Sequence, residues 1–243
     1  MSNYISAVKS RRNLPEWEKR VNQVNYKECN GWDRVSSRAK RDRESLAAMD
    51  FITPINGFAP ENSQETQDKK LILHYIEAFQ DTILLQDNQL AHITSSGFVV
   101  NRQLDKALMV HHNQRNTWAW TGGHADGERD LLQVAIKEAK EETGVKEVTP
   151  LTGRIVSLDI LPVYGHIKRG EWVSTHLHLS IAYILIADES ERLIVNEEEN
   201  SAVRWLPVDQ FRRDFFDSHD VYLYNKLIQR AKQIRAKTKD GIG

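Results

Sequence analysis

The sequence predicts an α/β (α+β) fold, in which helices cover a mixed β-sheet and a helical extension precedes the sheet. Apolar runs of strand length alternate with helical patterns from about residue 69 onward. Short turns separate several of these runs, which favours antiparallel pairs within a mixed sheet. The 243 residues are 40% hydrophobic and 28% charged, and their mean hydropathy is −0.56, as in an ordinary soluble domain.

Residues 1–67 are expected to form a basic helical extension that ends in a linker. Residues 1–45 hold 11 Lys and Arg against 6 Asp and Glu, although the chain has a net charge of −1. Two prolines, a glycine and a polar run predict a linker over residues 53–68. For the extension we rank a helical cap or a dimer element above an RNA contact.

Residues 68–243 are expected to form one domain. Helices are predicted where apolar residues recur three and four positions apart, at residues 71–86, 131–143 and 221–237. Strands are predicted where short runs of β-branched, aromatic and other apolar residues occur, at residues 98–100, 107–111, 118–120, 155–163, 176–186 and 203–206. The interspersed order of these elements supports a mixed sheet with helices on its faces.

The helix predicted at residues 131–143 has a specified beginning and end. Asp130 can cap its N-terminus, and Gln133 follows three residues later, as in a capping box. Gly144 stands where a left-handed residue ends a helix.

Three acids share one side of this helix. At about 100° per residue, Glu138, Glu141 and Glu142 fall within an arc of about 100°, beside the apolar face. Like charges at this spacing repel one another, and a divalent cation bound by oxygen ligands removes the conflict. The preceding Gly122-Gly123 pair is expected to form a turn that lets the backbone approach an ion or a phosphate.

These residues resemble the signature of the Nudix hydrolase family, G-x5-E-x7-R-E-U-x-E-E-x-G-U, where U is aliphatic. The matching positions are Gly123, Glu138, Ala139, Glu141, Glu142, Gly144 and Val145. Two positions depart, because Lys137 replaces the usual Arg and Arg129 stands where the family has a Glu. The run Gly-Gly-His-Ala-Asp-Gly resembles a recurring variant of the family. We expect Asp126 or Glu128 to pair with Lys137 instead.

The resemblance covers roughly residues 70–215 and implies a Nudix-like α/β/α sandwich. It implies a hydrolase that uses Mg²⁺, or Mn²⁺, to cleave the pyrophosphate linkage of a nucleoside diphosphate derivative such as a nucleoside triphosphate or ADP-ribose. Carried over by position, the metal ligands are Glu138, Glu141, Glu142 and the Gly123 carbonyl. Glu141, Glu142 and Lys137 are the catalytic candidates, and either glutamate or a downstream loop acid could be the base.

Four further residues are weaker candidates for substrate binding: Arg115, Trp118, His124 and Glu199. Trp118 could stack on a base, although either Trp118 or Trp120 is expected in the core. His176 and His178 alternate on one strand face, where core or surface histidines are commoner than ligands. Glu199 belongs to an acidic triplet that more often marks a solvated loop.

An enzyme is the leading interpretation, because all three glutamates of the signature are present. The alternative is a non-catalytic domain that senses a nucleotide and uses its basic N-terminal segment for interaction. An isopentenyl diphosphate isomerase is disfavoured, because Cys29 lies outside the matching region. We expect a cytoplasmic protein with a nucleotide-derived small-molecule substrate and no membrane or nucleic-acid partner, and a homodimer is compatible with the sequence.

Overall fold

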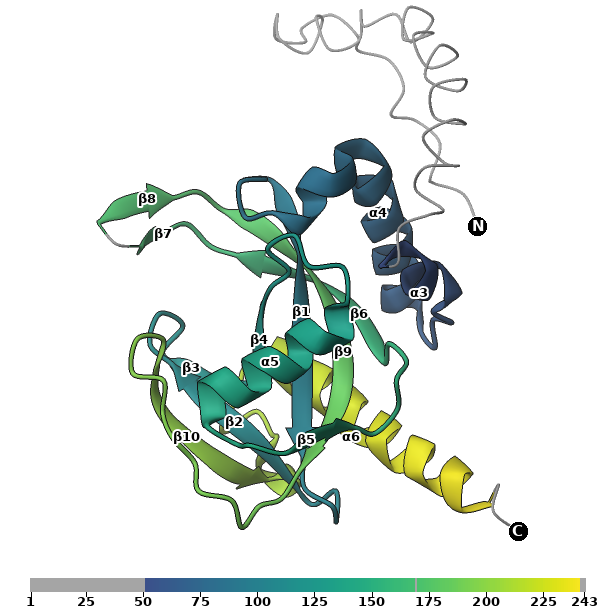
Figure 1. Cartoon of the computed structure of the whole chain (residues 1–243), viewed down its shortest axis with the longest axis vertical. Coiled ribbons are helices and arrows are strands. Elements are labelled where there is room, and N and C mark those ends of the chain that lie inside the picture. The colour runs from purple at the N-terminus through teal and green to yellow at the C-terminus, as the bar shows by residue number, and fades with distance from the viewer. Residues whose placement is uncertain (1–50, 169, 241–243) are drawn as a thin grey trace, which may run out of the picture. The chain divides into compact units, whose positions relative to one another are not determined.

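The computed structural model describes residues 51–168 and 170–240, and an eight-stranded mixed sheet lies at its centre (Figure 1). The strands of this sheet are β1 (Ala91–Val100), β2 (Lys106–His112), β3 (Thr117–Ala119), β4 (Thr121–His124), β5 (Val148–Pro150), β6 (Ser157–Val163), β9 (His176–Ala187) and β10 (Asn200–Pro207). Its main path runs β10-β2-β1-β9-β5, while β3 pairs with β2, β4 with β1 and β6 with β9. The pairing of β1 with β9 is parallel, and the other pairings are antiparallel.

Helices cover both faces of the sheet. α5 (Leu131–Thr143) crosses in front of β1 in Figure 1, and α6 (Ser218–Asp240) packs on the opposite face. Alternate residues of β9 therefore enter two cores, with Leu185 on the α5 side and Ile184 on the α6 side. Burial on both faces explains why every residue of β1 is buried. The predicted α/β/α layering is confirmed.

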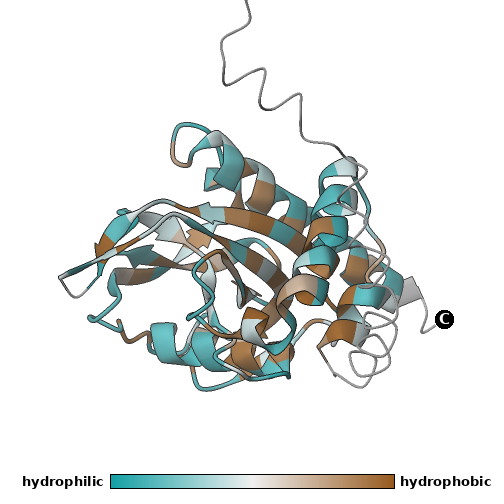
Figure 2. Ribbon diagram, turned by 90° about the horizontal axis from the view of Figure 1, so that it is seen from above, coloured by the Kyte–Doolittle hydropathy of each residue, from teal (hydrophilic) through white to brown (hydrophobic). Residues whose placement is uncertain are grey.

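Hydropathy follows these layers. The central strands and the inner sides of the helices are mostly brown in Figure 2, while the outer sides are mostly teal. On the α6 side, Phe98 stacks on Tyr224 with ring centroids 6.0 Å apart, and Trp120 meets the same tyrosine edge-on. Trp120 is thus a core residue, as expected for one of the two tryptophans. Every helix in the described part of the chain is too short or too polar for a membrane span.

The linker expected over residues 53–68 is wrong. Two helices, α3 (Ile52–Gly57) and α4 (Ser63–Phe79), occupy this segment, and a short 3₁₀ helix, η1 (Gln80–Leu84), follows them. The polar run misled because it forms the first turns of α4, where Asn62 caps the helix by accepting a hydrogen bond from the Glu65 N–H at 2.9 Å. Buried Ile55 and Ile72 join the α5-side core. The expected boundary after residue 67 falls inside α4, and the extension up to residue 50 lies outside the described residues.

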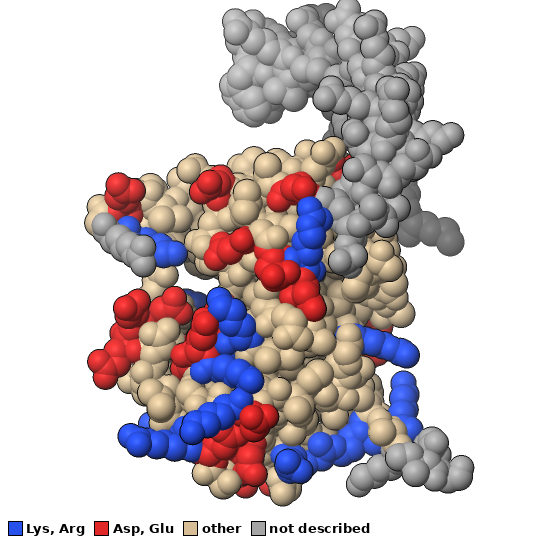
Figure 3. Space-filling model, in the orientation of Figure 1, with Lys and Arg blue, Asp and Glu red and all other residues tan. Residues whose placement is uncertain are grey.

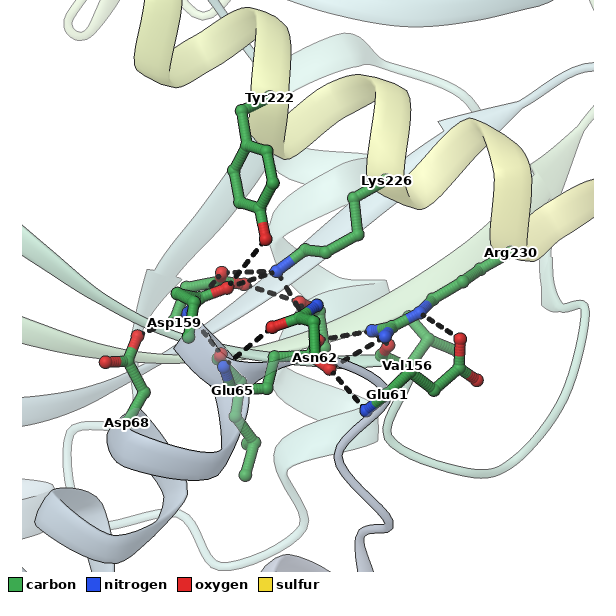
Figure 4. Close-up of polar contacts among 12 residues, drawn as sticks. Glu61, Asn62, Glu65, Asp68, Val156, Asp159, Tyr222, Lys226 and Arg230 are labelled. Atoms are coloured by element: carbon green, nitrogen blue, oxygen red, sulfur yellow. Dashed lines mark hydrogen bonds and ion pairs between the residues drawn. The ribbon is translucent and has the colours of Figure 1, made fainter.

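A buried ionic cluster joins α4 to β6 and α6 (Figure 4). Glu65 is fully buried and accepts hydrogen bonds from both terminal nitrogens of Arg230, with Nη2 at 2.7 Å. Lys226 Nζ lies 2.6 Å from Asp159 Oδ1 and 3.4 Å from Glu65 Oε1. Ser157 donates to Asp159 Oδ2 at 2.6 Å. These contacts attach α4 to β6 and α6, so α4 belongs to the folded domain.

A second, two-stranded sheet projects from the main one (Figure 1). It consists of β7 (His166–Lys168) and β8 (Glu171–Val173), inserted between β6 and β9. Large apolar side chains on and beside this hairpin are exposed, among them Tyr164 at 77% and Trp172 at 66%.

Candidate active site

The candidate site is built on α5, whose bounds match the predicted helix. Asp130 accepts a hydrogen bond from the Gln133 N–H at 3.2 Å, and Gly144 ends the helix in the left-handed region with φ 74°. Ser95 of β1 donates to the Leu131 carbonyl at 2.5 Å, which holds the start of the helix against the sheet. The helix therefore presents its glutamates in a fixed position beside β4.

The Gly122-Gly123 pair lies in strand β4 and forms no turn, so that expectation is wrong. Both glycines are paired with β1, and their role is close approach. A Cβ on Gly123 would lie 2.4 Å from Glu138 Cδ, so only a glycine lets this carboxylate reach the strand. The Gly122 N–H donates to Glu142 Oε1 at 3.2 Å. The main chain of β4 thus contacts two of the predicted ligands.

The three glutamates differ in exposure. Glu142 is 5% exposed, the side chain of Glu138 is 17% exposed, and that of Glu141 is 55% exposed. Burial raises the pKa of Glu142 to about 8, and the charges of Glu138 and Glu199 raise it as well, while the Gly122 N–H opposes this. Burial also raises the pKa of Glu138, against the effect of Lys137. The protein holds these carboxylates together at an electrostatic cost.

A fourth acid reaches the site from the loop before β10. The charge of Glu199 raises the pKa of both Glu138 and Glu142, so its carboxylate is near enough to act on them from another element. The loop is held there because the Asn113 N–H donates to the Glu199 carbonyl at 2.9 Å. The next residue, Asn200, is 1% exposed and its side chain lowers the pKa of Glu142. Sequence reasoning missed Asn200, because nothing in the local pattern marks it.

These residues fit a divalent cation. The carboxylates of Glu138 and Glu142 lie against the main chain of β4 at Gly122-Gly123, and the charge of Glu199 acts on both. Hard cations such as Mg²⁺ take such oxygen ligands, and their charge offsets the repulsion that raises these pKa values. By the resemblance to the Nudix signature, Glu138, Glu141, Glu142 and the Gly123 carbonyl would hold the ion.

Comparison with known proteins decides the family. A family model described as the NUDIX domain matches residues 90–227, which is more than half of the chain. The chain belongs to the Nudix family. No curated protein matches this Nudix chain in sequence.

Three solved structures are examples of the proteins that this Nudix chain resembles in fold. One is a NUDIX-family hydrolase from Clostridium perfringens, with 20% identity and a TM-score of 0.41, over 57% of this chain and 96% of that one. Another is an mMutator MutT protein from Bacillus halodurans, with 19% identity and a TM-score of 0.37, over 56% and 81%. A third is an Ap4A hydrolase from C. elegans, with 13% identity and a TM-score of 0.38, over 61% and 98%.

Lys137, which stands at the usual Arg of the Nudix signature, pairs within its own helix. Its Nζ lies 3.6 Å from Glu138 Oε1 and 3.4 Å from Glu141 Oε2, and its side chain is 65% exposed. The expected pairing with Asp126 or Glu128 is wrong, since Asp126 accepts from Gln86 at 2.9 Å and Glu128 accepts from the N–H groups of residues 129 and 130. The lysine is thus placed to hold two glutamates rather than to brace the loop.

Arg129, the second departure from the Nudix signature, braces the loop to a different element. Its Nη2 lies 2.9 Å from Asp81 Oδ2 in η1, and its guanidinium stands over the Phe51 ring at 5.7 Å from the centroid. The segment before β1 therefore supports the loop of this Nudix domain.

The weaker candidates are spread around the site. Arg115 lies in the loop between β2 and β3 and pairs with buried Asp220 at 3.4 Å. Trp118 of β3 is half-buried, with the Arg204 guanidinium 4.8 Å from its ring centroid and His111 edge-on at 5.2 Å. Both side chains already have protein partners, so their part in substrate binding stays a prediction. Acidic and basic side chains are interspersed over this face of the Nudix domain in Figure 3.

His124 belongs to a cluster of histidines that sequence reasoning did not find. His92 and His178 lie beside it, with ring centroids 4.9 Å and 5.1 Å from its own. Burial lowers the pKa of His124 to about 4 and that of His178 to about 2. The alternation of His176 and His178 was visible in the sequence, but the strand register that adds His92 was not.

Proposed function

We propose that this chain is a divalent-metal-dependent pyrophosphohydrolase that cleaves a nucleoside diphosphate derivative. The observation that carries the proposal is the close approach of Glu138 and Glu142 to the main chain of Gly122-Gly123 in a chain of the Nudix family. When bound, a divalent cation neutralises phosphate oxygens and polarises water for attack. Mg²⁺ is the expected ion, and Mn²⁺ is compatible with the same oxygen ligands.

The proposed reaction adds water across one phosphoanhydride. The water oxygen bonds to one phosphorus, the bond between that phosphorus and the bridging oxygen breaks, and the bridging oxygen leaves with the other phosphorus. A carboxylate accepts the proton of the water. Glu142, Glu141 and Glu199 are the candidates for this base, and Glu199 has support because its charge acts on both Glu138 and Glu142. Lys137 would position Glu138 and Glu141 through its two ion pairs.

The test uses the purified chain, Mg²⁺ and a panel of nucleoside triphosphates, ADP-ribose, dinucleotide polyphosphates and sugar nucleotides, with products separated by chromatography. We expect the double variant Glu141→Gln/Glu142→Gln to lose turnover by roughly 10²-fold or more, because electrostatic stabilisation of the phosphates is lost. Glu147→Gln, an exposed glutamate just beyond α5, is the matched control and should keep the wild-type rate.

The panel also separates catalysis from sensing. Tight binding of one compound without turnover by the wild-type chain would contradict the proposal and favour a nucleotide-sensing domain. Turnover that survives in the double variant would place the chemistry outside α5. The substrate, the cytoplasmic location and a homodimer stay predictions.

A further inference from the structure

Four histidines gather on the sheet face opposite α5. His92 lies on β1, His124 ends β4, and His176 and His178 lie on β9. His92 pairs in register with His178, and His124 pairs with the residue two positions after His92. Side chains alternate along a strand, so these residues lie on the face of Phe98 and Ile184, which α6 covers farther along. The rings come from three strands but meet at one place.

The rings are close together and largely buried. Five pairs of ring centroids lie between 4.9 and 5.2 Å apart. His92 is 3% exposed and His176 is 8% exposed. A packing role alone does not account for so many polar rings at one site, because each buried ring nitrogen needs a partner.

Backbone contacts orient two of the rings. His92 Nδ1 lies 3.0 Å from the Asn88 carbonyl, and His176 Nδ1 lies 2.9 Å from the Ser174 carbonyl. A carbonyl only accepts hydrogen bonds, so each Nδ1 carries the proton and each Nε2 keeps a free lone pair. A second partner that fixes the tautomer in this way is typical of metal-binding histidines.

Two buried ring nitrogens lack a partner. Within the described residues, Nε2 of His92 and Nε2 of His178 are buried and make no hydrogen bond. Leaving a buried polar atom unsatisfied costs about 1–3 kcal/mol. A cation that both nitrogens coordinate would remove that cost.

We propose that His92, His176 and His178 bind a transition-metal ion, Zn²⁺ being the best match, with His124 or a water as the fourth ligand. One ligand nitrogen from each of the three lies within 4.8 Å of the others. Zn–N bonds of about 2.0–2.1 Å in a tetrahedron place nitrogens about 3.3–3.4 Å apart, so a shift of about an ångström closes the site. Imidazoles suit zinc and its neighbours, whereas Mg²⁺ and Ca²⁺ take oxygen ligands.

This site is distinct from the carboxylates of α5. It lies on the other face of the sheet, and its ligands are neutral nitrogens rather than charged oxygens. Bound zinc would tie β1 to β9, and through His124 it would also hold β4 at the residue that follows Gly123. The zinc proposal does not depend on the proposed hydrolysis, and the two are tested separately.

The first experiment measures Zn²⁺ binding to the full chain after treatment with a chelator, by equilibrium dialysis and elemental analysis. We expect one equivalent per chain and a zinc-dependent rise in Tm, because the ion binds the folded state. Loss of a group that only hydrogen-bonds to a metal ligand lowers metal affinity by about 10- to 100-fold. The double variant His92→Asn/His178→Asn removes two ligands, so its affinity for zinc should fall by more than that.

Two controls define the location. His74→Asn/His219→Asn removes two exposed histidines elsewhere and should leave zinc affinity unchanged. Glu141→Gln/Glu142→Gln alters the carboxylate site and should also leave it unchanged. The proposal would be overturned if the glutamate variant lost zinc while the His92→Asn/His178→Asn variant kept it. It would also be overturned if the wild-type chain bound no zinc.

A second measurement does not depend on a variant that folds. X-ray absorption of the zinc-loaded wild-type chain should show nitrogen ligands at about 2.0–2.1 Å with the scattering pattern of imidazole rings. A shell of oxygen ligands alone would contradict the assignment, whatever the stoichiometry.

Discussion

At the scale of single residues, the site depends on what Gly123 lacks. Gly127, Gly144 and Gly170 use positive φ angles, whereas Gly123 is a strand residue whose missing Cβ makes room for Glu138. Signature matching identifies the position, but only the packing explains why a glycine stands there. The strand main chain and the carboxylate must share a space that any other residue would fill.

Gly123→Ala is therefore expected to impair activity more than stability. The new Cβ would lie 2.4 Å from Glu138 Cδ, so the carboxylate must move by about an ångström. A misplacement of that size can reduce a rate by about 10²-fold. Kinetics on the substrate found in the panel measure kcat/KM, and urea unfolding measures stability.

Gly153→Ala is the control for this prediction, because a Cβ there meets nothing within 4 Å. The control should keep the wild-type kcat/KM. Equal activity of Gly123→Ala and the wild-type chain would mean that Glu138 is not required beside the strand.

At the scale of elements, the C-terminal end of α5 depends on Gly144. The residue has φ 74°, and the chain returns over it, since the Ile194 N–H donates to the Thr143 carbonyl at 2.8 Å. A Cβ on Gly144 would lie 2.6 Å from Ile194 Cβ. Conformation and close contact thus both require glycine, which is why the predicted end of the helix is also the observed one.

Gly144→Ala should lower the free energy of unfolding by about 2 kcal/mol, because a left-handed alanine is strained and the contact with Ile194 must open. Urea unfolding followed by circular dichroism gives this value. Gly57→Ala, at the end of α3, meets no atom within 4 Å and should stay within about 1 kcal/mol of the wild type. A Gly144→Ala chain as stable as the wild type would show that the segment around Ile194 is not held against α5.

At the scale of the whole molecule, the cluster of Figure 4 joins segments far apart in the chain. Glu65 of α4 meets Arg230 and Lys226 of α6, and Asp159 of β6 shares Lys226. Burial raises the pKa of Glu65, but the hydrogen bond from Arg230 and the charges of both cations outweigh it and hold the pKa below the usual 4.5. The folded domain therefore favours the charged carboxylate.

Glu65→Gln should destabilise the domain by about 3–5 kcal/mol at pH 7, because it leaves buried cations without their partner. A folded-state pKa below 4.5 means that the stabilisation is present above pH 4.5 and is lost as pH falls through the folded pKa. The difference between wild type and variant should therefore shrink below pH 4.5. Thermal unfolding from pH 7 to pH 3 measures both stabilities.

Glu61→Gln is the matched control for this cluster. Glu61 meets the same Arg230 at 3.4 Å, but its side chain is 58% exposed. An exposed pair contributes about 0–1 kcal/mol, so the control should unfold close to the wild type. A pH-independent difference for Glu65→Gln would contradict the role of its charge.

Local sequence was enough to predict the helix at residues 131–143, most strand positions and the family. Caps, periodicity and signature spacing act within a few residues, so neighbours along the chain specify them. The linker prediction failed for the complementary reason. The residues at 53–68 are polar and rich in turn formers, yet Glu65 becomes part of the core only because its partners lie on distant elements.

Only the tertiary structure decided which side chains meet. Arg129 reaches η1, and Glu199 lies near enough to α5 for its charge to raise the pKa of Glu142. His92 and His178 become neighbours through the register of two parallel strands, across a long stretch of chain. Such contacts depend on how strands align and which face a residue takes, and a shift of one residue would reverse every face.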